Sequence, residues 1–83
     1  MITELNERTQ AILRHIVDAY LLTGEPIGSA TVTNDLNLGV SSATIRNIMS
    51  RLETDGLLFS PHTSAGRLPT QRGLRMYVDG LME

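Results

Sequence analysis

Apolar residues recur at helical spacing in three segments of this chain, and only short breaks separate these segments. The first segment, residues 7–22, follows the favourable N-cap Asn6, and Gly24 and Pro26 stop it. Its apolar stripe comprises Ile12, Leu13, Ile16, Val17, Tyr20 and Leu21. The sequence therefore predicts an amphipathic helix over residues 7–22 that packs through one face.

A pair of helices is predicted on the two sides of the short break "NLGV". Ser29 is the expected N-cap of a two-turn helix over residues 30–36, and Gly39 is the expected positive-φ residue of the break. Ser41 is expected to cap a third helix over residues 42–55. The inward stripe of this helix comprises Ile45, Ile48, Met49 and Leu52. Two helices joined by a short turn that contains glycine are typical of a helix-turn-helix.

Two short strands around a polar loop are predicted after the third helix. The segments "LLF" (57–59) and "RLP" (67–69) are expected to pair, with the loop "SPHTSAGR" (60–67) between them. Pro69 suits the edge of such a hairpin, because it has no N–H to donate. The chain therefore predicts a small hairpin with a loop rich in hydrogen-bonding groups.

A last helix is predicted over residues 71–83, with Thr70 as its N-cap. Gly73 and Gly80 are expected to weaken it, since glycine is a poor helix former. Its inward positions are Leu74, either Tyr77 or Val78, and Leu81. The helical pattern reaches the end of the chain without a C-cap, so we expect residues 70–83 to begin a linker helix in a longer protein.

The predicted order of elements indicates a mainly α fold with a small β-hairpin. It is that of a winged helix-turn-helix, with a three-helix core, a two-stranded wing and a C-terminal helix. Residues 1–83 are expected to form one such domain, because a chain of this length buries a single small core. Only three residues are aromatic, so this core should be aliphatic.

Charge is distributed unevenly along the chain, although the net charge is only −2. Residues 1–40 hold two arginines and five acids, a net −3, whereas residues 41–78 hold five arginines and two acids, a net +3. Every basic side chain is arginine, the cation suited to bidentate contacts with phosphate and guanine. The asymmetry favours a polyanion as the partner of the second half, although ordinary solvated charge remains an alternative.

The outer face of the third helix is the first candidate for nucleic-acid contact, because the second helix of a helix-turn-helix enters the major groove. Arginine reads guanine and asparagine reads adenine there through paired hydrogen bonds. N–H groups at the helix start can hold a phosphate. The candidates on this recognition helix (41–55) are Ser41, Ser42, Thr44, Arg46, Asn47 and Arg51. The alternative is that they form only the solvated side of an amphipathic helix.

The loop between the two strands is the second candidate. Hydroxyls, backbone N–H groups and a guanidinium suit phosphate oxygens, and such contacts position a protein on a duplex without specifying sequence. An arginine of a wing can also enter a narrow minor groove. The candidates in this wing (60–68) are His62, Thr63, Ser64, Gly66 and Arg67. Arg67 is the principal candidate, and His62 either touches DNA or only braces the loop.

Other chemistry is disfavoured by size, composition and spacing. A Ser-His-Asp site would need a third group and an oxyanion pocket, and the spacing of a phosphate-binding loop is missing. With no cysteine and no partner for His15 at metal-ligand spacing, no metal or cofactor is expected, and His15 is interpreted as structural. The chain has no signal-peptide pattern and no apolar run near ~18 residues, so a cytoplasmic, non-enzymatic protein is expected.

Three stretches resemble the HrcA family of heat-inducible transcription repressors. They are "LNERTQAILRHIVDAYLLTGEPIGS", "SSATIRNIMSRLETDGLL" and "SPHTSAGRLPTQRGLRMYVDGLM", and together they run from about Leu5 to Met82. The pattern within residues 61–79 is very specific to that family, whereas "SSATIRN" is common to many winged-helix repressors.

This resemblance implies a repressor of chaperone operons that binds an inverted-repeat operator called CIRCE. It also implies a homodimer in the full-length protein, dependence on the chaperonin GroEL, and a larger C-terminal region that carries much of the dimerisation. Residues 41–55 would be its recognition helix and "HTSAGR" its wing. The alternative function is a winged-helix module that binds other proteins without binding DNA.

Overall fold

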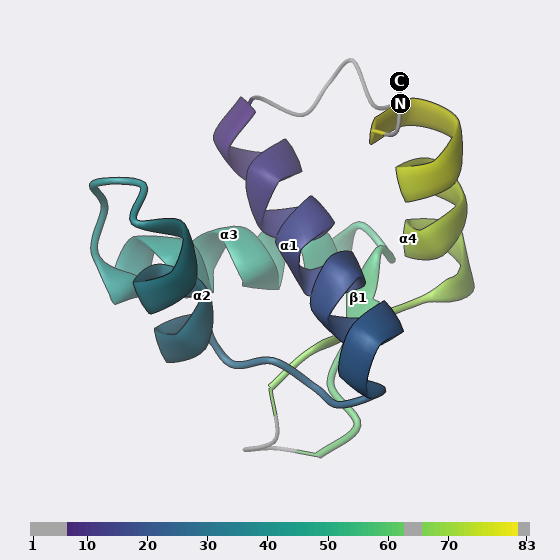
Figure 1. Cartoon of the computed structure of the whole chain (residues 1–83), viewed down its shortest axis with the longest axis horizontal. Helices are drawn as coiled ribbons and strands as arrows, with labels where there is room; N and C mark the ends of the chain where they lie inside the picture. Colours follow the sequence, from purple (N-terminus) through teal and green to yellow (C-terminus); the bar gives the residue numbers. More distant parts are fainter. Residues whose placement is uncertain (1–6, 63–65, 82–83) are drawn as a thin grey trace.

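Three helices surround the centre of the molecule. Helix α1 (Glu7–Thr23) lies between α2 (Ser29–Leu36) and the C-terminal helical segment, and α3 (Ser42–Thr54) packs behind it (Figure 1). The computed structural model describes residues 7–62 and 66–81, so the N-cap expected at Asn6 lies outside the described residues. The three helices occupy nearly the ranges predicted from the spacing of apolar residues.

The core is aliphatic, as the low aromatic content predicts. Within the described residues, the buried hydrophobic side chains come from all three helices, from the first strand of the hairpin and from the segments next to it. They are Ile12, Leu13, Ile16, Val17, Ile27, Val32, Ile45, Met49, Leu52, Leu57 and Leu58. The inward faces predicted for the first and third helices thus meet in one cluster.

Two details of the first two helices differ from the prediction. The apolar stripe of α1 was expected to include Leu21, yet this side chain is 63% exposed, in a last turn of α1 (21–23) that is exposed throughout. Ser29 was expected to cap α2, but the N-cap is Gly28, and Ser29 is the first helical residue. The Ser29 carbonyl instead accepts a hydrogen bond from Thr33 Oγ1 at 2.7 Å.

The turn between α2 and α3 agrees with the helix-turn-helix prediction. Gly39 has φ +77°, as expected, and Asn37, the C-cap of α2, also adopts the left-handed region, with φ +50°. Ser41 caps α3 by accepting a hydrogen bond from the Thr44 N–H at 3.2 Å. This short turn fixes the angle between the two helices and leaves the outer face of α3 uncovered.

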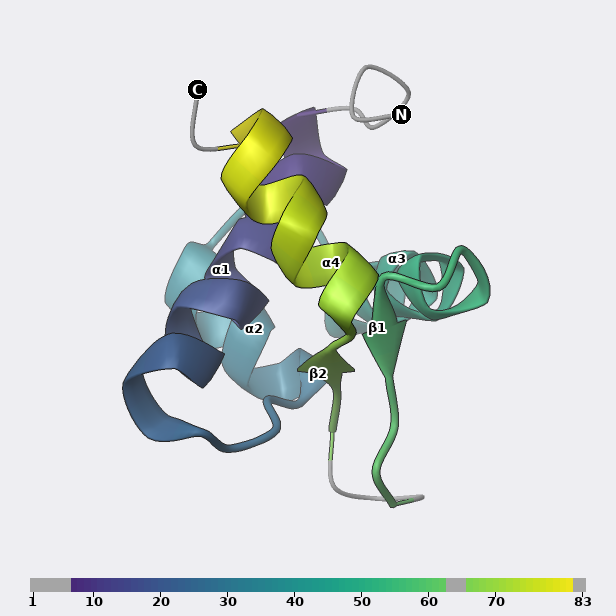
Figure 2. The ribbon, with the colours of Figure 1, turned by 90° about the vertical axis from the view of Figure 1, so that its right-hand side faces the viewer.

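The hairpin consists of strands β1 (Leu58–Phe59) and β2 (Leu68–Pro69), which pair antiparallel (Figure 2). Leu58 pairs with Pro69 and Phe59 with Leu68, so each strand is one residue shorter than predicted. Arg67 was predicted to start the second strand, but it forms an isolated bridge with Ile27 through two backbone hydrogen bonds of 2.9 and 3.0 Å. The base of the wing is therefore tied to the segment before α2.

The C-terminal helix begins as predicted and then changes its geometry. Helix α4 (Gln71–Met76) is capped by Thr70, and residues Tyr77–Leu81 continue it as the π-helix η2. Of the two alternatives for the inward position, Tyr77 is half-buried and Val78 is 60% exposed. The side chain of Leu81 lies outside the described residues.

A hydrogen bond joins this last segment to the first helix. Tyr77 Oη donates to Asp18 Oδ1 on α1 at 2.6 Å. This bond raises the pKa of the Tyr77 phenol above its ordinary value of 10.0, because the hydrogen bond to the Asp18 carboxylate stabilises the protonated phenol. Desolvation and the charge of Asp18 act in the same direction, and Arg14 opposes them.

The order of the helices and strands, and the antiparallel pairing of β1 with β2, are those of a winged helix.

Candidate nucleic-acid interface

The start of α3 places its three hydroxyl residues in different surroundings. Ser41 and Thr44 are occupied with each other: besides the capping bond, their hydroxyl oxygens lie 3.2 Å apart. Ser42, the first helical residue, is half-buried. The capping geometry leaves the remaining N–H groups of the first turn directed out of the helix end, where an anion can bind.

The outer face of α3 presents the three longer polar side chains that the sequence singled out. Arg46, Asn47 and Arg51 are exposed. No hydrogen bond or ion pair engages these side chains within residues 7–62 and 66–81. The inward residues Ile45, Met49 and Leu52 hold the opposite face in the core, so Arg46 and Asn47 have to project away from the molecule. This face can offer paired hydrogen bonds to base edges.

The structure describes only part of the wing candidates. Thr63 and Ser64 lie outside the described residues, and His62 is exposed. Gly66 has φ +93°, and a Cβ atom there would meet the backbone C and O atoms of Ile27 at 2.7 Å. Gly66 is therefore placed by close backbone contact with the segment before α2.

Arg67 lies at the base of the wing, directly before β2. Its Nε atom lies 2.8 Å from Oε1 of Glu53 in the last turn of α3. The Nε–H does not point at the carboxylate, so this contact is an ion pair without an aligned hydrogen bond. Nη1 also approaches the Gly66 carbonyl oxygen at 3.5 Å. The charge of Arg67 is thus partly neutralised within the protein.

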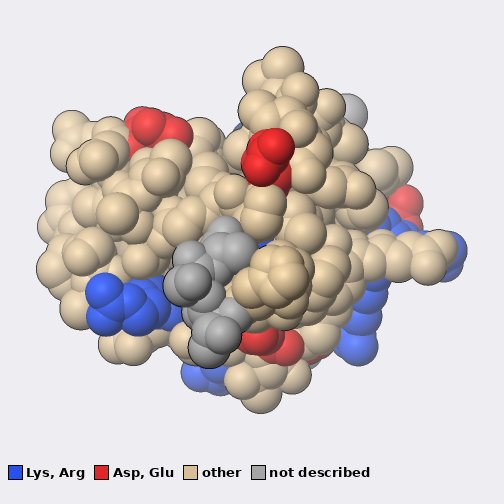
Figure 3. Space-filling view, turned by 90° about the horizontal axis from the view of Figure 1, so that it is seen from below, with Lys and Arg blue, Asp and Glu red and all other residues tan. Residues whose placement is uncertain are grey.

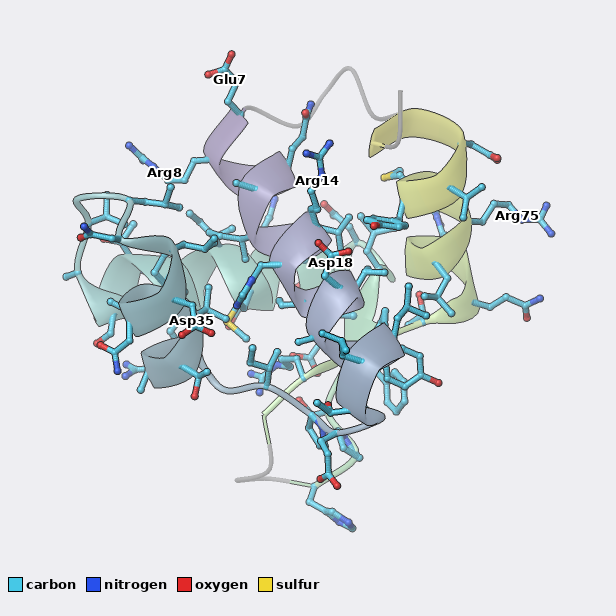
Figure 4. The ribbon with its side chains drawn as sticks, in the orientation of Figure 1. Glu7, Arg8, Arg14, Asp18, Asp35 and Arg75 are labelled. Atoms are coloured by element: carbon cyan, nitrogen blue, oxygen red, sulfur yellow. The ribbon has the colours of Figure 1, made fainter. Side chains whose placement is uncertain are left out.

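Basic and acidic side chains are interspersed over the surface that carries the wing (Figure 3). On the face shown there, the positive charge is therefore not one continuous patch. Arg75, on α4, points away from the other elements (Figure 4).

His15 has a partner that its sequence neighbours do not reveal. His15 Nε2 lies 2.9 Å from Oδ2 of Asp35, and the contact joins α1 to α2. Its half-buried side chain agrees with the structural interpretation. The described part of the chain contains no group of three or more His, Asp or Glu residues arranged to hold a metal ion, and none of its helices is long and apolar enough to cross a membrane.

Sequence reasoning missed two residues that shape this region. Glu53 was counted only as one of the acids near the arginines, and its pairing with Arg67 spans 14 positions, so no local periodicity indicates it. Ile27 was not singled out, yet it forms a bridge with Arg67. In the sequence, Ile27 is a lone apolar residue between a proline and a glycine, and this pattern only weakly indicates a buried, paired position.

Comparison with known proteins gives matches over nearly the whole chain. A heat-inducible transcription repressor HrcA from Sphingopyxis alaskensis is 56% identical over 82 residues, which are 99% of this chain and 24% of that protein. HrcA from Gluconobacter oxydans is 58% identical over 79 residues, or 95% of this chain and 22% of that protein. The chain thus spans about a quarter of the length of these relatives. No family model matches the chain.

Solved structures give the same fold. A crystal structure of a hypothetical protein matches with a TM-score of 0.88 and 43% identity, over 99% of this chain and 26% of that one. A hypothetical protein from Sulfolobus solfataricus matches with a TM-score of 0.71 and 25% identity, over 86% of this chain and 51% of that one. Because more than half of the residues are identical over almost its entire length, the chain belongs to the HrcA family of heat-inducible transcription repressors.

Proposed function

We propose that this chain is the DNA-binding domain of a heat-inducible repressor and that it binds an inverted-repeat operator of the CIRCE type upstream of chaperone operons. The observation that carries the proposal is the exposed pair Arg46 and Asn47 on the outer face of α3, the second helix of the helix-turn-helix. Family membership of the whole chain supports the same function.

The residues of α3 divide into two roles in this proposal. Arg46 and Asn47 read base edges in the major groove, since their side chains make paired hydrogen bonds to guanine and adenine. Arg51 lies one turn further along and contacts the phosphate backbone. Ser41, Ser42 and Thr44 lie at the start of the helix, whose N–H groups bind a phosphate. The mutual hydrogen bonds of Ser41 and Thr44 hold this end in place.

The wing positions the domain on the duplex. His62, Thr63, Ser64 and Gly66 are proposed to contact the sugar-phosphate backbone, which adds affinity without specifying sequence. Arg67 is proposed to lie beside the backbone or the minor groove with its Nη groups, while its Nε remains close to Glu53. Because of this ion pair, Arg67 brings less free positive charge to DNA than Arg46 does.

The full-length repressor is proposed to act as a homodimer, because a two-fold dimer matches an inverted repeat. The chaperonin GroEL is its proposed protein partner, in keeping with the family resemblance. No catalytic step, metal or cofactor is part of this function, and the protein is proposed to act in the cytoplasm.

The first test is Arg46→Ala, assayed by fluorescence anisotropy on an operator duplex and on a shuffled duplex. Loss of the base contact should weaken operator binding by about 1–3 kcal/mol and reduce discrimination between the two duplexes. Arg75→Ala is the matched control, since it removes the same charge from α4, and its discrimination should equal that of the parent. Equal discrimination by the parent and Arg46→Ala would contradict the proposal.

A second candidate function, a winged-helix module that binds proteins, is favoured by one observation. Large apolar side chains are exposed on α1, β1 and η2, namely Leu21, Leu22, Phe59 and Val78. None of them lies on α3, however, where a partner of the recognition face would need them. Salt distinguishes the two functions: DNA affinity should fall by about 0.9 log units per log unit of salt for each phosphate neutralised, whereas apolar docking should persist.

A further inference from the structure

We propose that Glu53 is the residue that positions the wing relative to the recognition helix, so that its carboxylate is needed for operator discrimination although it repels DNA. This inference rests on the proposed function for its effect on DNA. Its structural part, that Glu53 fixes the wing, can be tested in the free protein.

One carboxylate contacts both arms of the wing. Glu53 Oε1 lies 2.8 Å from Arg67 Nε, and Glu53 Oε2 accepts a hydrogen bond from Ser60 Oγ at 3.1 Å. Ser60 directly follows β1, and Arg67 directly precedes β2. Glu53 therefore connects the end of α3 to the point where the chain enters the wing loop and to the point where it returns.

The register of the hairpin explains why this connection matters. The ladder has only two pairs, Leu58 with Pro69 and Phe59 with Leu68, so Ser60 and Arg67 are the next positions opposite each other. The backbone N–H and C=O of Arg67 bond to Ile27 instead. Among the described residues, the side-chain contacts that join this third position across the hairpin pass through Glu53.

The outgoing strand, which Ser60 follows, depends on the contact with Glu53 more than the returning strand does. The returning strand is fixed by Arg67 to Ile27 and by Thr70, whose Oγ1 donates to the Gly56 carbonyl oxygen at 2.6 Å. The outgoing strand ends its ladder at Phe59. Loss of Glu53 would therefore release the wing loop first on its Ser60 side and would also free the charge of Arg67.

Charge alone predicts the opposite effect on DNA binding. Removing an acid beside a DNA-binding surface should strengthen binding to every duplex, because it reduces repulsion of the phosphates. Backbone contacts of the wing carry no sequence information, but they set the register in which α3 meets the base edges. If Glu53 positions the wing, its removal should therefore weaken binding to the operator, where base contacts have to be aligned, while binding to a shuffled duplex stays equal or rises. The two explanations thus differ in sign.

The test compares the parent chain, Glu53→Ala, Glu53→Gln and the control Asp55→Asn on operator and shuffled duplexes. Asp55 is an exposed acid at the same end of α3, so Asp55→Asn should bind both duplexes equally well or better. Glu53→Ala should lower the ratio of operator to shuffled affinity roughly tenfold. Glu53→Gln keeps one accepting oxygen and should lower the ratio less.

A double variant tests whether the effect passes through Arg67. Adding Arg67→Ala to Glu53→Ala should change operator affinity much less than Arg67→Ala changes it in the parent, because the two side chains act together. Full additivity of the two substitutions would overturn the role of the ion pair. Operator binding by Glu53→Ala that equals or exceeds that of the parent would overturn the inference as a whole.

The free protein separates this inference from the proposed function. Amide hydrogen exchange at Phe59 and Leu68, the last paired positions of the ladder, should accelerate in Glu53→Ala and remain unchanged in Asp55→Asn. If the parent fails to discriminate the operator, the proposed function fails, yet this exchange measurement still decides whether Glu53 fixes the wing. Unchanged exchange at both positions in Glu53→Ala would refute the structural part.

Discussion

Gly73 is buried in α4 directly beneath the carbonyl group of Leu57. A Cβ atom at this position would collide with the Leu57 oxygen, and that backbone atom cannot rotate away as a side chain can. The sequence predicted only that glycine weakens the helix. The structure shows what the glycine contributes: the absence of a side chain lets α4 pack directly against Leu57, the residue before β1.

Gly73→Ala is expected to destabilise the fold. Alanine would gain about 1 kcal/mol of helix propensity over glycine, but the clash with the Leu57 carbonyl should cost about 1–3 kcal/mol and move α4. Urea unfolding followed by circular dichroism measures the balance. Gly28→Ala is the control, because nothing lies within 4 Å of its Cβ position, and its effect should stay below about 1 kcal/mol. A more stable Gly73→Ala variant would contradict the packing argument.

At the scale of elements, the N-caps of the helices show which helix starts follow from the local sequence and which depend on tertiary packing. Ser41 and Thr70 cap α3 and α4 as predicted, because the side-chain oxygen of each accepts a hydrogen bond from the backbone N–H three residues further on. Ser29 does not cap α2. Gly28, whose backbone is extended, takes the capping position, and the preceding residue Ile27 is held by Arg67 from a distant part of the chain.

Thr70 has two roles at the junction of the wing and α4. Its Oγ1 accepts from the Gly73 N–H at 3.0 Å and donates to the Gly56 carbonyl oxygen at 2.6 Å. Thr70→Val keeps the shape but loses both bonds, so the free energy of unfolding should fall by about 1–3 kcal/mol. Thr70→Ser keeps the hydroxyl and should lose clearly less. Thermal or urea unfolding of the two variants side by side checks this, and equal losses would argue that the methyl group, not the hydroxyl, matters.

At the scale of the whole molecule, stability depends on a small aliphatic core. A domain of this size has roughly 4–12 kcal/mol of total stability at about 0.05–0.15 kcal/mol per residue. Leu52 on α3 is fully buried, whereas Leu22 on α1 is 85% exposed. The core therefore couples the placement of α3 to the stability of the fold.

Leu52→Ala is expected to lower the free energy of unfolding by about 2–5 kcal/mol, because it leaves a cavity in the core. Leu22→Ala removes the same atoms from the surface and should change it by less than about 0.5 kcal/mol. Urea titration of both variants measures the difference. Similar losses in the two variants would mean that Leu22 is covered in solution.

Most of the helical framework could be predicted because its signals are local. The apolar stripes, the Gly39 break and the two serine or threonine caps each lie within a few residues of the element they define. The candidate site was predictable to the same extent: burial of Ile45, Met49 and Leu52 forces Arg46 and Asn47 outward. Whether these two residues read DNA stays a prediction.

The sequence by itself determined the order of the elements, the inward faces of α1 and α3, and the exposure of the arginine and asparagine on α3, because these follow from helical periodicity. Only the tertiary structure decided the surroundings of Arg67, Glu53 and Ile27. These residues are 14 to 40 positions apart, and they meet because the packed core brings the end of α3 and the segment before α2 to the base of the wing. Contacts of this kind leave no periodic pattern in a single sequence, since they depend on how the helices pack rather than on the residues next to them.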